Sequence, residues 1–440
     1  MFPVRYSIFK QITAIASVAL TIFLGYYADR NQFFSFITAY ALFFALYIWV
    51  CFYQGQTESR FWINLGIALR VLLLFSLPNL SDDFYRFIWD GRLTMAGYHP
   101  FIHTPRYFVE NQIFTTGVSV ALFNKLNSPD YFTVYPPVSQ VIFAISAWFS
   151  AGNDRLAVVI IKLFLLLGEI GVIRILARQF NQPKAAVLYA LNPLVILELT
   201  GNCHFEGLMV FFILLGILTI RKTDVLKSAV YWALAVATKL LPVLFVPLVW
   251  RWLGWRRGLQ FVLWFGLFSL ILFLPLLAVF PQIFESIDLY FREFQFNASI
   301  YYLVREIGFA KIGWDIGEFS GPALAALALL GVLLISLFGG WKKQKSESLF
   351  ASIIVFSLFL YYSLAAVVQP WYLCVPFALS LITPWRFMIW WTGLVALSYS
   401  HYDGGGREEH FWLIGLEYGV LWGILLWDVL KRYTGDGPID

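Results

Sequence analysis

The chain has 440 residues, of which 60% are hydrophobic, 19% are aromatic and only 13% are charged. A soluble domain of this length has roughly a quarter of its residues charged, so too few polar side chains are present to cover a water-soluble globule. The net charge of +5 is modest and indicates no nucleic-acid partner. The three cysteines, Cys51, Cys203 and Cys374, lie far apart and have no metal-ligand spacing. The composition predicts an integral membrane protein.

Apolar runs of about 20 residues, the length that spans a bilayer as a helix, follow one another along the chain. The expected spans are 12–28, 33–53, 61–77, 155–177, 184–200, 205–221, 259–280, 321–339, 348–367, 371–384, 386–400 and 411–430. We therefore expect an all-α polytopic helical bundle with about 12–14 transmembrane helices. Residues 1–440 are expected to form one membrane domain, with a short disordered tail, "DGPID".

Two further apolar segments do not fit a simple span. Segment 137–151 is too short, so we expect an interfacial or re-entrant helix. Segment 227–252 is too long and contains Lys239 and Pro242, which predicts a break near "TKLLP". Such a broken hairpin is allowed when it is buried against other helices.

The basic residues between spans predict the orientation, because short cytoplasmic loops are rich in Lys and Arg. Those assigned to the cytoplasmic side are Arg5, Lys10, Arg60, Arg174, Arg178, Lys184, Arg221, Lys222, Lys227, Arg251, Arg256, Arg257, Lys342, Lys343, Lys345, Arg386, Lys431 and Arg432. The N-terminus is then cytoplasmic, and the connections 78–136 and 282–320 are large outer loops. The five histidines, His99, His103, His204, His401 and His410, also fall on the outer side. Any chemistry is therefore expected on the extracytoplasmic face.

The stretch "SDDFYRFIWDGR", residues 81–92, follows directly after an apolar run. On a helix, Asp82, Asp83, Arg86 and Asp90 lie within about 100° of one another, with i,i+4 pairs from Asp82 to Arg86 and from Arg86 to Asp90. One interpretation is an interfacial amphipathic helix with a salt-bridged, solvated face. The other is a functional carboxylate pair, in which Asp82 or Asp83 accepts a proton or both bind a divalent cation.

Downstream polar residues interrupt apolar sequence in two places. In "YFTVYPPVSQ", the two prolines predict a rigid turn, and Tyr135 is a candidate site residue. In "ALNPLVILELTGNCHFEG", the Asn-Pro pair predicts a kink, after which His204 and Glu206 emerge on the outer side.

The lysine at 239 lies within an apolar run and needs an anionic partner. We expect either an ion pair with Glu198 or Glu169, or the phosphate of a lipid ligand.

Three later outer segments carry candidate site residues. They are Arg305 in "QFNASIYYLVREIG", Gln369, Trp371 and Tyr372 in "QPWYLCVP", and His401 and Arg407 in "HYDGGGREEH". Aromatic belts at the membrane interface also explain tyrosines and tryptophans at such places. The three glycines are equally compatible with a flexible turn and with a backbone shaped around a ligand.

The ordered series "DDFYRFIWDG", "GYHPF", "YPP", "NPL", then Glu and His, "K…P" and "PWY" resembles the C-type superfamily of integral membrane glycosyltransferases. It is most similar to bacterial mannosyltransferase-like members that use a polyprenyl-phosphate sugar. The resemblance runs from about residue 78 to 376 and implies a multi-pass protein of the bacterial plasma membrane.

The resemblance implies transfer of a hexose, expected to be mannose, from a polyprenyl-phosphate donor to a hydroxyl of a lipid or glycan acceptor. Asp82 or Asp83 then acts as the general base of an inverting displacement, with Asp82 favoured because it is nearer the membrane. The expected substrate-binding residues are Arg86, Asp90, Tyr135, His204, Glu206, Lys239, Arg305, Gln369, Trp371, Tyr372, His401 and Arg407. No cofactor is required, although the aspartate pair has the chemistry to bind Mg²⁺ or Mn²⁺.

Two other functions compete with this one. A lipid or polysaccharide transporter is expected to show inverted repeats and polar sites at the membrane midplane. A lipid-linked polysaccharide polymerase or ligase is expected to depend on arginines and a histidine in a later loop. The acidic pair in the first outer loop, and the gathering of polar residues on one face, favour the glycosyltransferase.

Overall fold

The computed structural model describes residues 2–54, 58–338 and 345–434. Lys342, Lys343 and the "DGPID" tail, for which we made predictions, lie outside these ranges, and the side chain of Arg5 is also not described. The described residues form helices and loops, with only two isolated β-bridges, Thr115–Val118 and Phe296–Val367. The predicted all-α class is confirmed.

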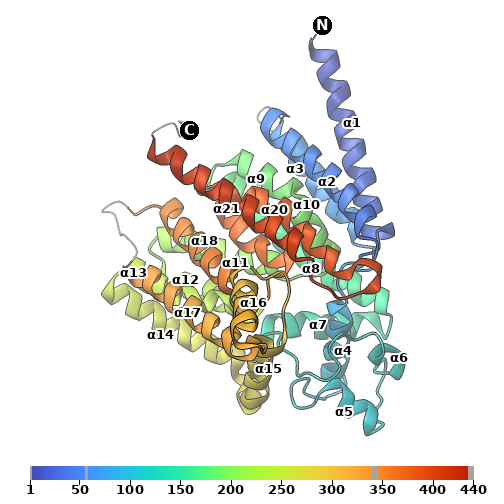
Figure 1. The fold of residues 1–440 in the computed structure, drawn as a ribbon. Helices are drawn as coiled ribbons and strands as arrows, with labels where there is room; N and C mark the ends of the chain where they lie inside the picture. The colour runs from blue at the N-terminus through green and yellow to red at the C-terminus, as the bar shows by residue number, and fades with distance from the viewer. Residues whose placement is uncertain (1, 55–57, 339–344, 435–440) are drawn as a thin grey trace.

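Three N-terminal helices stand at one side of the bundle (Figure 1). They are α1 (Phe2–Ile22), α2 (Phe33–Trp49) and α3 (Ser59–Leu73), with π-helical turns η1 (Phe23–Tyr27) and η2 (Val50–Gln54). The amide of Asn79 donates to the carbonyls of Leu24 and Ala28 at 2.8 and 2.7 Å. This contact joins the end of η1 to the segment after α3, and so places the α1–α2 connection beside the head of the first large loop.

The first large loop folds into short helices below α1–α3 in Figure 1. They are α4 (Asp83–Met95), α5 (Pro105–Glu110) and α6 (Val120–Phe123), and they precede α7 (Pro137–Ser150). The ring of Phe87 in α4 stacks on Phe143 in α7 with centroids 4.6 Å apart. Pro137 at the first position of α7 fits the predicted turn, since proline has no amide hydrogen to lose there.

The central helices contain the predicted kink and the predicted break. They are α8 (Asp154–Arg174), η3 (Ile175–Gln179), α9 (Pro183–Leu191), α10 (Pro193–Val195), η4 (Ile196–Gly201), α11 (Glu206–Arg221) and α12 (Val225–Thr238). The chain bends by 57° at Asn192, whose side chain accepts a hydrogen bond from the amide of Val195. Helix α12 ends at Thr238, and Lys239 is extended.

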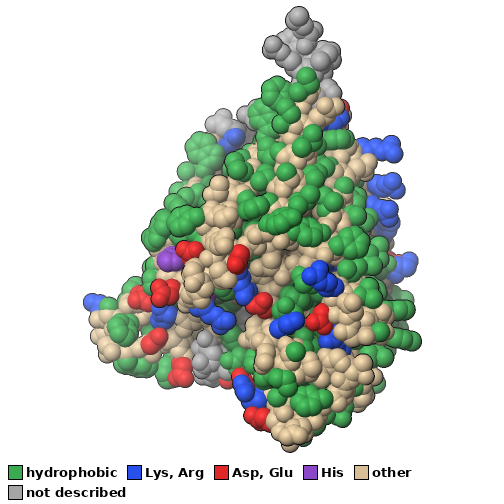
Figure 2. All heavy atoms as spheres, turned by 90° about the vertical axis from the view of Figure 1, so that its right-hand side faces the viewer, with side chains coloured by type: hydrophobic (Ala, Val, Ile, Leu, Met, Phe, Trp, Pro, Cys, Tyr) green, Lys and Arg blue, Asp and Glu red, His purple; other side chains and the backbone are tan. Residues whose placement is uncertain are grey.

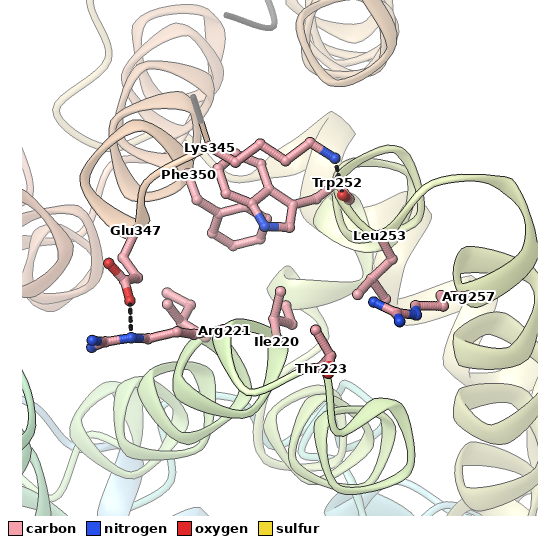
Figure 3. Close-up of a pocket in the computed structure, with 10 residues that line it drawn as sticks. Ile220, Arg221, Thr223, Trp252, Leu253, Arg257, Lys345, Glu347 and Phe350 are labelled. Carbon is pink, nitrogen blue, oxygen red and sulfur yellow. Dashed lines mark hydrogen bonds and ion pairs between the residues drawn. The ribbon is translucent and has the colours of Figure 1, made fainter. Parts of the chain in front are cut away.

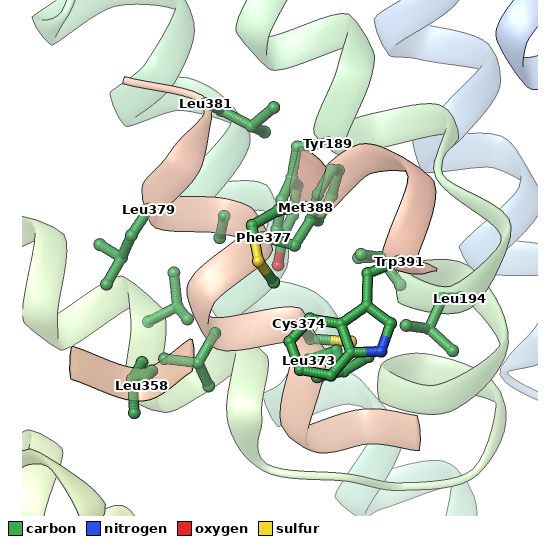
Figure 4. Packing of buried hydrophobic residues seen from close by; sticks show 14 of the residues in the cluster. Tyr189, Leu194, Leu358, Leu373, Cys374, Phe377, Leu379, Leu381, Met388 and Trp391 are labelled. Carbon is green, nitrogen blue, oxygen red and sulfur yellow. The ribbon is translucent and has the colours of Figure 1, made fainter. Parts of the chain in front are cut away.

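The C-terminal half completes the bundle around a large apolar core. Its elements are η5 (Leu241–Phe245), α13 (Val246–Leu253), α14 (Trp255–Phe273), η6 (Leu274–Val279), α15 (Phe280–Glu293), α16 (Ile300–Ile312), α17 (Gly317–Phe338), α18 (Glu347–Leu364), η7 (Pro370–Leu373), α19 (Cys374–Ser380), α20 (Phe387–Leu394), η8 (Val395–Gly405) and α21 (Phe411–Tyr433). In Figure 4, Phe377 and Cys374 of α19 lie among Tyr189, Met388 and Trp391. The core cluster extends from Leu24 to Leu425, so it joins both halves of the chain.

By length and composition, seven helices of the described chain can cross a membrane, or eight if the pair bent at Asn192 counts as one span. This is fewer than the 12–14 expected, because runs such as 61–77 and 205–221 form helices shorter than 18 residues. Figure 2 shows hydrophobic side chains over the upper part of one face, and acidic ones gathered over its lower half. This pattern fits a polytopic membrane protein with a polar end.

Candidate active site

The two loop-head aspartates stand at the N-terminus of α4, where the helix dipole favours negative charge. Asp82 occupies the N-cap position and Asp83 is the first helical residue. Asp82 forms an ion pair with Arg30 from the α1–α2 connection. Asp83 accepts hydrogen bonds from Asn127 at 2.8 Å and from the hydroxyl of Tyr135 at 3.2 Å. The adjacent carboxylates therefore have separate partners.

Arg86 and Asp90 lie on the same helix but are buried, with 3% and 0% of their side chains exposed. Their predicted i,i+4 pair is confirmed, at 2.8 Å, whereas the predicted Asp82–Arg86 pair is wrong because Asp82 turns toward Arg30. The guanidinium of Arg86 also donates to the carbonyls of Ser128 and Tyr131, at 3.1 and 2.9 Å. Because Arg86 and Asp90 are buried, they do not form the solvated face of an amphipathic helix. Their contacts instead hold the loop at Ser128 and Tyr131 in place.

The amide of Gln140 completes this buried network. Its Nε2 donates to Asp90 at 3.0 Å and to Thr133 at 3.3 Å. Tyr135 lies between Thr133 and Gln140 in the sequence, and its ring packs edge-on against Phe87 with centroids 4.7 Å apart. Burial raises the pKa of Tyr135 well above its usual range, and the Asp83 carboxylate adds to this effect. Tyr135 therefore stays protonated and donates to Asp83.

A second group of candidates surrounds the short connection between η4 and α11. The imidazole of His204 stacks on Trp371 with ring centroids 3.7 Å apart, and its Nε2 lies 3.4 Å from Glu198. The hydroxyl of Tyr399 donates to the same glutamate. Burial, with the charge of Lys239 adding to it, holds the pKa of His204 well below its usual range. His204 is therefore a neutral imidazole at neutral pH.

Lys239 joins this second group from the break after α12. It forms an ion pair with Glu206, and its ammonium lies 5.3 Å from the ring centroid of Tyr372. Of our two alternatives for its partner, the one with Glu198 or Glu169 is wrong, and the lipid phosphate stays a prediction. Glu169 is instead paired with Arg70 at 2.6 Å, and both of these side chains are completely buried.

The two groups meet around Phe205. Its ring packs against Phe87 and Phe143, with centroids 5.8 and 5.5 Å apart, and so holds the 202–206 connection against α4 and α7. Glu206 lies in the electrostatic field of both Lys239 and Asp83. The structure thus packs the segment that carries His204 and Glu206 against α4 and α7, and brings Asp83 within electrostatic range of Glu206.

The four remaining candidates, all from the C-terminal half of the chain, have other partners or are partly or fully exposed. His401 Nδ1 is 3.4 Å from Glu409. Arg305 contacts Gln295, Glu306 and the ring of Tyr302, so it belongs to a different set of contacts from the aspartates. Gln369 is half-buried at the start of η7, and Arg407 is exposed.

Tyr402 connects this region to the loop head. The guanidinium of Arg30 lies 5.0 Å from its ring centroid. Burial raises the pKa of Tyr402 to about 12, while Arg30 and Arg407 oppose this rise and Asp83 and Asp82 add to it. The Tyr402 hydroxyl is therefore within electrostatic range of both aspartates and of two arginines.

Sequence reasoning missed several of these partners, namely Arg30, Asn127, Tyr399 and Tyr402. Arg30 did carry a signal, because it is a basic residue on the side that the charge pattern assigns to the outside. Asn127, Tyr399 and Tyr402 carry no local signal. They reach the site only through the fold.

The two aspartates do not converge on one point with a third ligand. Over the described ranges, no group of three or more His, Cys, Asp or Glu side chains is arranged to hold a metal ion. The polar contacts present are ion pairs and hydrogen bonds. This arrangement offers a fixed proton acceptor, Asp83, and cations nearby.

Comparisons with known proteins identify a family for this chain. The family described as alpha-(1->6)-mannopyranosyltransferase, N-terminal domain, matches residues 8–254. This range contains α4, the aspartates, Tyr135, His204, Glu206 and Lys239, but not the segments with Trp371 and Arg407.

Two curated relatives carry the name alpha-(1->6)-mannopyranosyltransferase A. The relative from Corynebacterium glutamicum is 25% identical over 211 residues, which is 45% of this chain and 41% of the relative. The relative from Mycobacterium tuberculosis is 28% identical over 223 residues, 47% of this chain and 41% of the relative. The matched region thus spans about two fifths of either relative's length. Because the family model covers more than half of the 440 residues, this chain belongs to the alpha-(1->6)-mannopyranosyltransferase family.

Proposed function

We propose that this chain is a membrane mannosyltransferase that moves mannose from a polyprenyl-phosphate donor to a hydroxyl group of a lipid or glycan acceptor. The observation that carries the proposal is the position of Asp83, which is oriented by Asn127 and Tyr135 and lies within electrostatic range of Glu206, the partner of Lys239. The family supports mannose as the sugar, and the relatives' names support a 6-hydroxyl acceptor.

Asp83 is the general base in this proposal. It takes the proton of the acceptor hydroxyl while the acceptor oxygen attacks the anomeric carbon and the bond from that carbon to the phosphate oxygen breaks. The sugar is transferred with inversion, and polyprenyl phosphate leaves. An α-linked product therefore requires a β-linked donor. Asp82 is less suited to this role, because its carboxylate is already engaged in an ion pair with Arg30.

The departing phosphate needs positive charge nearby. Lys239 supplies it, since its side chain is 23% exposed and lies beside the Tyr372 ring, where a ligand can reach it. Arg30 and Arg407 extend the positive potential on the side of Tyr402.

The reaction takes place on the extracytoplasmic side of a bacterial plasma membrane. The charge pattern supports this orientation, and so does the arrangement of the helices. The N-terminal end of α1 lies at the top of Figure 1, whereas α4, α5 and α6 lie at the opposite end.

The proposed transfer requires no metal, because the donor is a phosphate diester that releases a phosphate monoester, and protein cations lie close to this leaving group. Excess EDTA in membranes that contain the protein is expected to leave transfer within about twofold of its untreated rate. Loss of transfer with EDTA and its recovery with Mg²⁺ or Mn²⁺ would show that a metal takes part.

The test of the base compares Asp83→Asn with Asp82→Asn, using a polyprenyl-phosphate mannose donor and an α-(1→6)-linked dimannoside that carries an alkyl chain. We expect Asp83→Asn to lower the rate about 100-fold or more, since general-base catalysis contributes that much. Asp82→Asn is expected to cost about fivefold or less, because it changes one partly exposed ion pair.

The matched control is Asp130→Asn, which makes the same chemical change in the exposed Arg106–Asp130 pair of the same loop. It is expected to retain the wild-type rate. A folded Asp83→Asn protein with full activity would rule out this residue as the base. Absence of transfer by the wild type from any polyprenyl-phosphate sugar would overturn the function itself.

A further inference from the structure

A cavity of about 410 Å³ lies at the end of α11 opposite to Glu206 (Figure 3). Glu206 begins this helix and Arg221 ends it. Fifteen residue steps at 1.5 Å each separate the two by about 22 Å along the axis. The cavity is therefore separate from the candidate active site. It is lined by residues of α11, α13, α14 and α18 and of the connections beside them.

The lining has an excess of positive charge. Arg221, Arg257 and Lys345 contribute three cations, and Glu347 contributes one carboxylate, which lies 3.0 Å from Arg221. Lys345 donates to the main-chain carbonyl of Trp252, and none of the described residues gives it a carboxylate partner. Arg257 extends from α14 toward the cavity in Figure 3, and the described residues give it no carboxylate partner. Two positive charges are thus available to an anion.

The rest of the lining is apolar and aromatic. Ile220 and Leu253 face the cavity from α11 and α13 in Figure 3. The rings of Trp252 and Phe350 pack edge-to-face, with centroids 5.0 Å apart, and the ammonium of Lys345 lies 5.7 Å from the Trp252 ring centroid. A pocket with cations at its rim and apolar walls suits a ligand that joins a phosphate to hydrocarbon.

We propose that this pocket binds a phosphate-bearing head group of an anionic lipid. Arginine suits this ligand because its planar guanidinium donates two parallel hydrogen bonds to phosphate oxygens. The pocket lies among the basic residues that the charge pattern assigns to the cytoplasmic side, where anionic lipid head groups are concentrated. The phosphate bound here is distinct from that of the sugar donor, which lies about one helix length away.

The test measures stabilisation of the purified full-length protein in neutral detergent by added phosphatidylglycerol, with phosphatidylcholine as the zwitterionic comparison. Inorganic phosphate and glycerol 3-phosphate form a second arm, which distinguishes a lipid from a free phosphate compound. The variants are Arg257→Gln, Lys345→Gln and their combination. Arg256→Gln is the matched control, because it removes a neighbouring exposed arginine of α14 that does not line the cavity.

We expect phosphatidylglycerol to raise the Tm of the wild type and of Arg256→Gln more than phosphatidylcholine does. The apparent affinity should fall about tenfold in each pocket variant, the size of one lost charged hydrogen bond. Arg257→Lys, which keeps the charge, should lose less. All three cations are exposed, so folding should not depend on them. If the combined variant does not fold, the two single variants provide the same comparison.

Four outcomes decide the proposal. Site-dependent stabilisation by phosphatidylglycerol alone supports a lipid ligand, and equal stabilisation by glycerol 3-phosphate assigns the pocket to a free phosphate compound. Equal effects of phosphatidylglycerol and phosphatidylcholine, or unchanged affinity in the pocket variants, would overturn it.

Discussion

Glu206 is buried, with 2% of its side chain exposed, and Lys239 forms the ion pair with its carboxylate. Removing one member of a buried pair leaves the other charge without compensation, which costs more than the pair itself contributes. Lys239 remains partly exposed, however, and is also the cation that we assign to the donor phosphate. Its effect on stability and its effect on transfer can therefore be separated by substitution.

We expect Lys239→Met to lower the free energy of unfolding by about 3 kcal/mol, because Glu206 is left buried and unpaired. The double variant Lys239→Met/Glu206→Gln should recover most of this loss, since no uncompensated charge remains. Transfer should stay low in both, because neither has the cation at the phosphate. The measurements are thermal unfolding and mannose transfer. Wild-type transfer by the double variant would show that Lys239 has only a structural role.

At the scale of elements, the orientation of Asp83 depends on the contact between α4 and α7. Gly91 permits this contact, because a Cβ atom at this position would lie 2.2 Å from the main-chain carbonyl oxygen of Phe143. Backbone atoms cannot move aside as a flexible side chain can. Any side chain at position 91 must therefore push α4 away from α7, and Asp83 moves with α4.

We expect Gly91→Ala to lower the free energy of unfolding by about 2 kcal/mol, the usual cost of overpacking, and to reduce transfer. Gly266→Ala is the control, since Gly266 also lies within a helix but has no atoms within 4 Å of an added Cβ. It should leave stability unchanged or raise it by up to about 1 kcal/mol, because alanine favours helix more than glycine does. Equal effects of the two substitutions on unfolding and transfer would contradict the importance of the α4–α7 contact.

At the scale of the whole molecule, α11 runs from the candidate active site to the basic cavity. Its first residue, Glu206, belongs to the candidate active site, and its last residue, Arg221, lies beside the basic cavity. The orientation predicted from the basic residues places these ends on opposite sides of the membrane. The three native cysteines are buried, which favours a labelling experiment with a low background.

We expect Asn111→Cys, at the exposed end of α5, to react in intact cells with a thiol reagent that cannot cross membranes. Lys222→Cys, just after α11, should react only after the membrane is opened. The wild type without added cysteines measures the background. Labelling of both positions from the same side, or the reverse order, would contradict the proposed orientation.

The sequence alone predicted the elements well, because the forces that form them are local. Apolar length predicted the helices, and Asn192–Pro193 predicted the kink that the structure shows as a 57° bend. Lys239 and Pro242 predicted a break near the place where α12 ends, at Thr238. The i,i+4 spacing predicted the Arg86–Asp90 pair for the same reason. The count of long spans was less predictable, since apolar composition does not distinguish a helix that crosses the membrane from a shorter one buried in the protein.

The sequence by itself determined that this is a helical membrane protein and which polar segments could carry its chemistry. Only the tertiary structure decided which of those residues meet. Asp82 meets Arg30, 52 positions earlier, and Lys239 meets Glu206 rather than Glu198 or Glu169. The periodicity of a helix relates residues three or four positions apart, whereas these pairs form because packing of separate helices brings distant residues together.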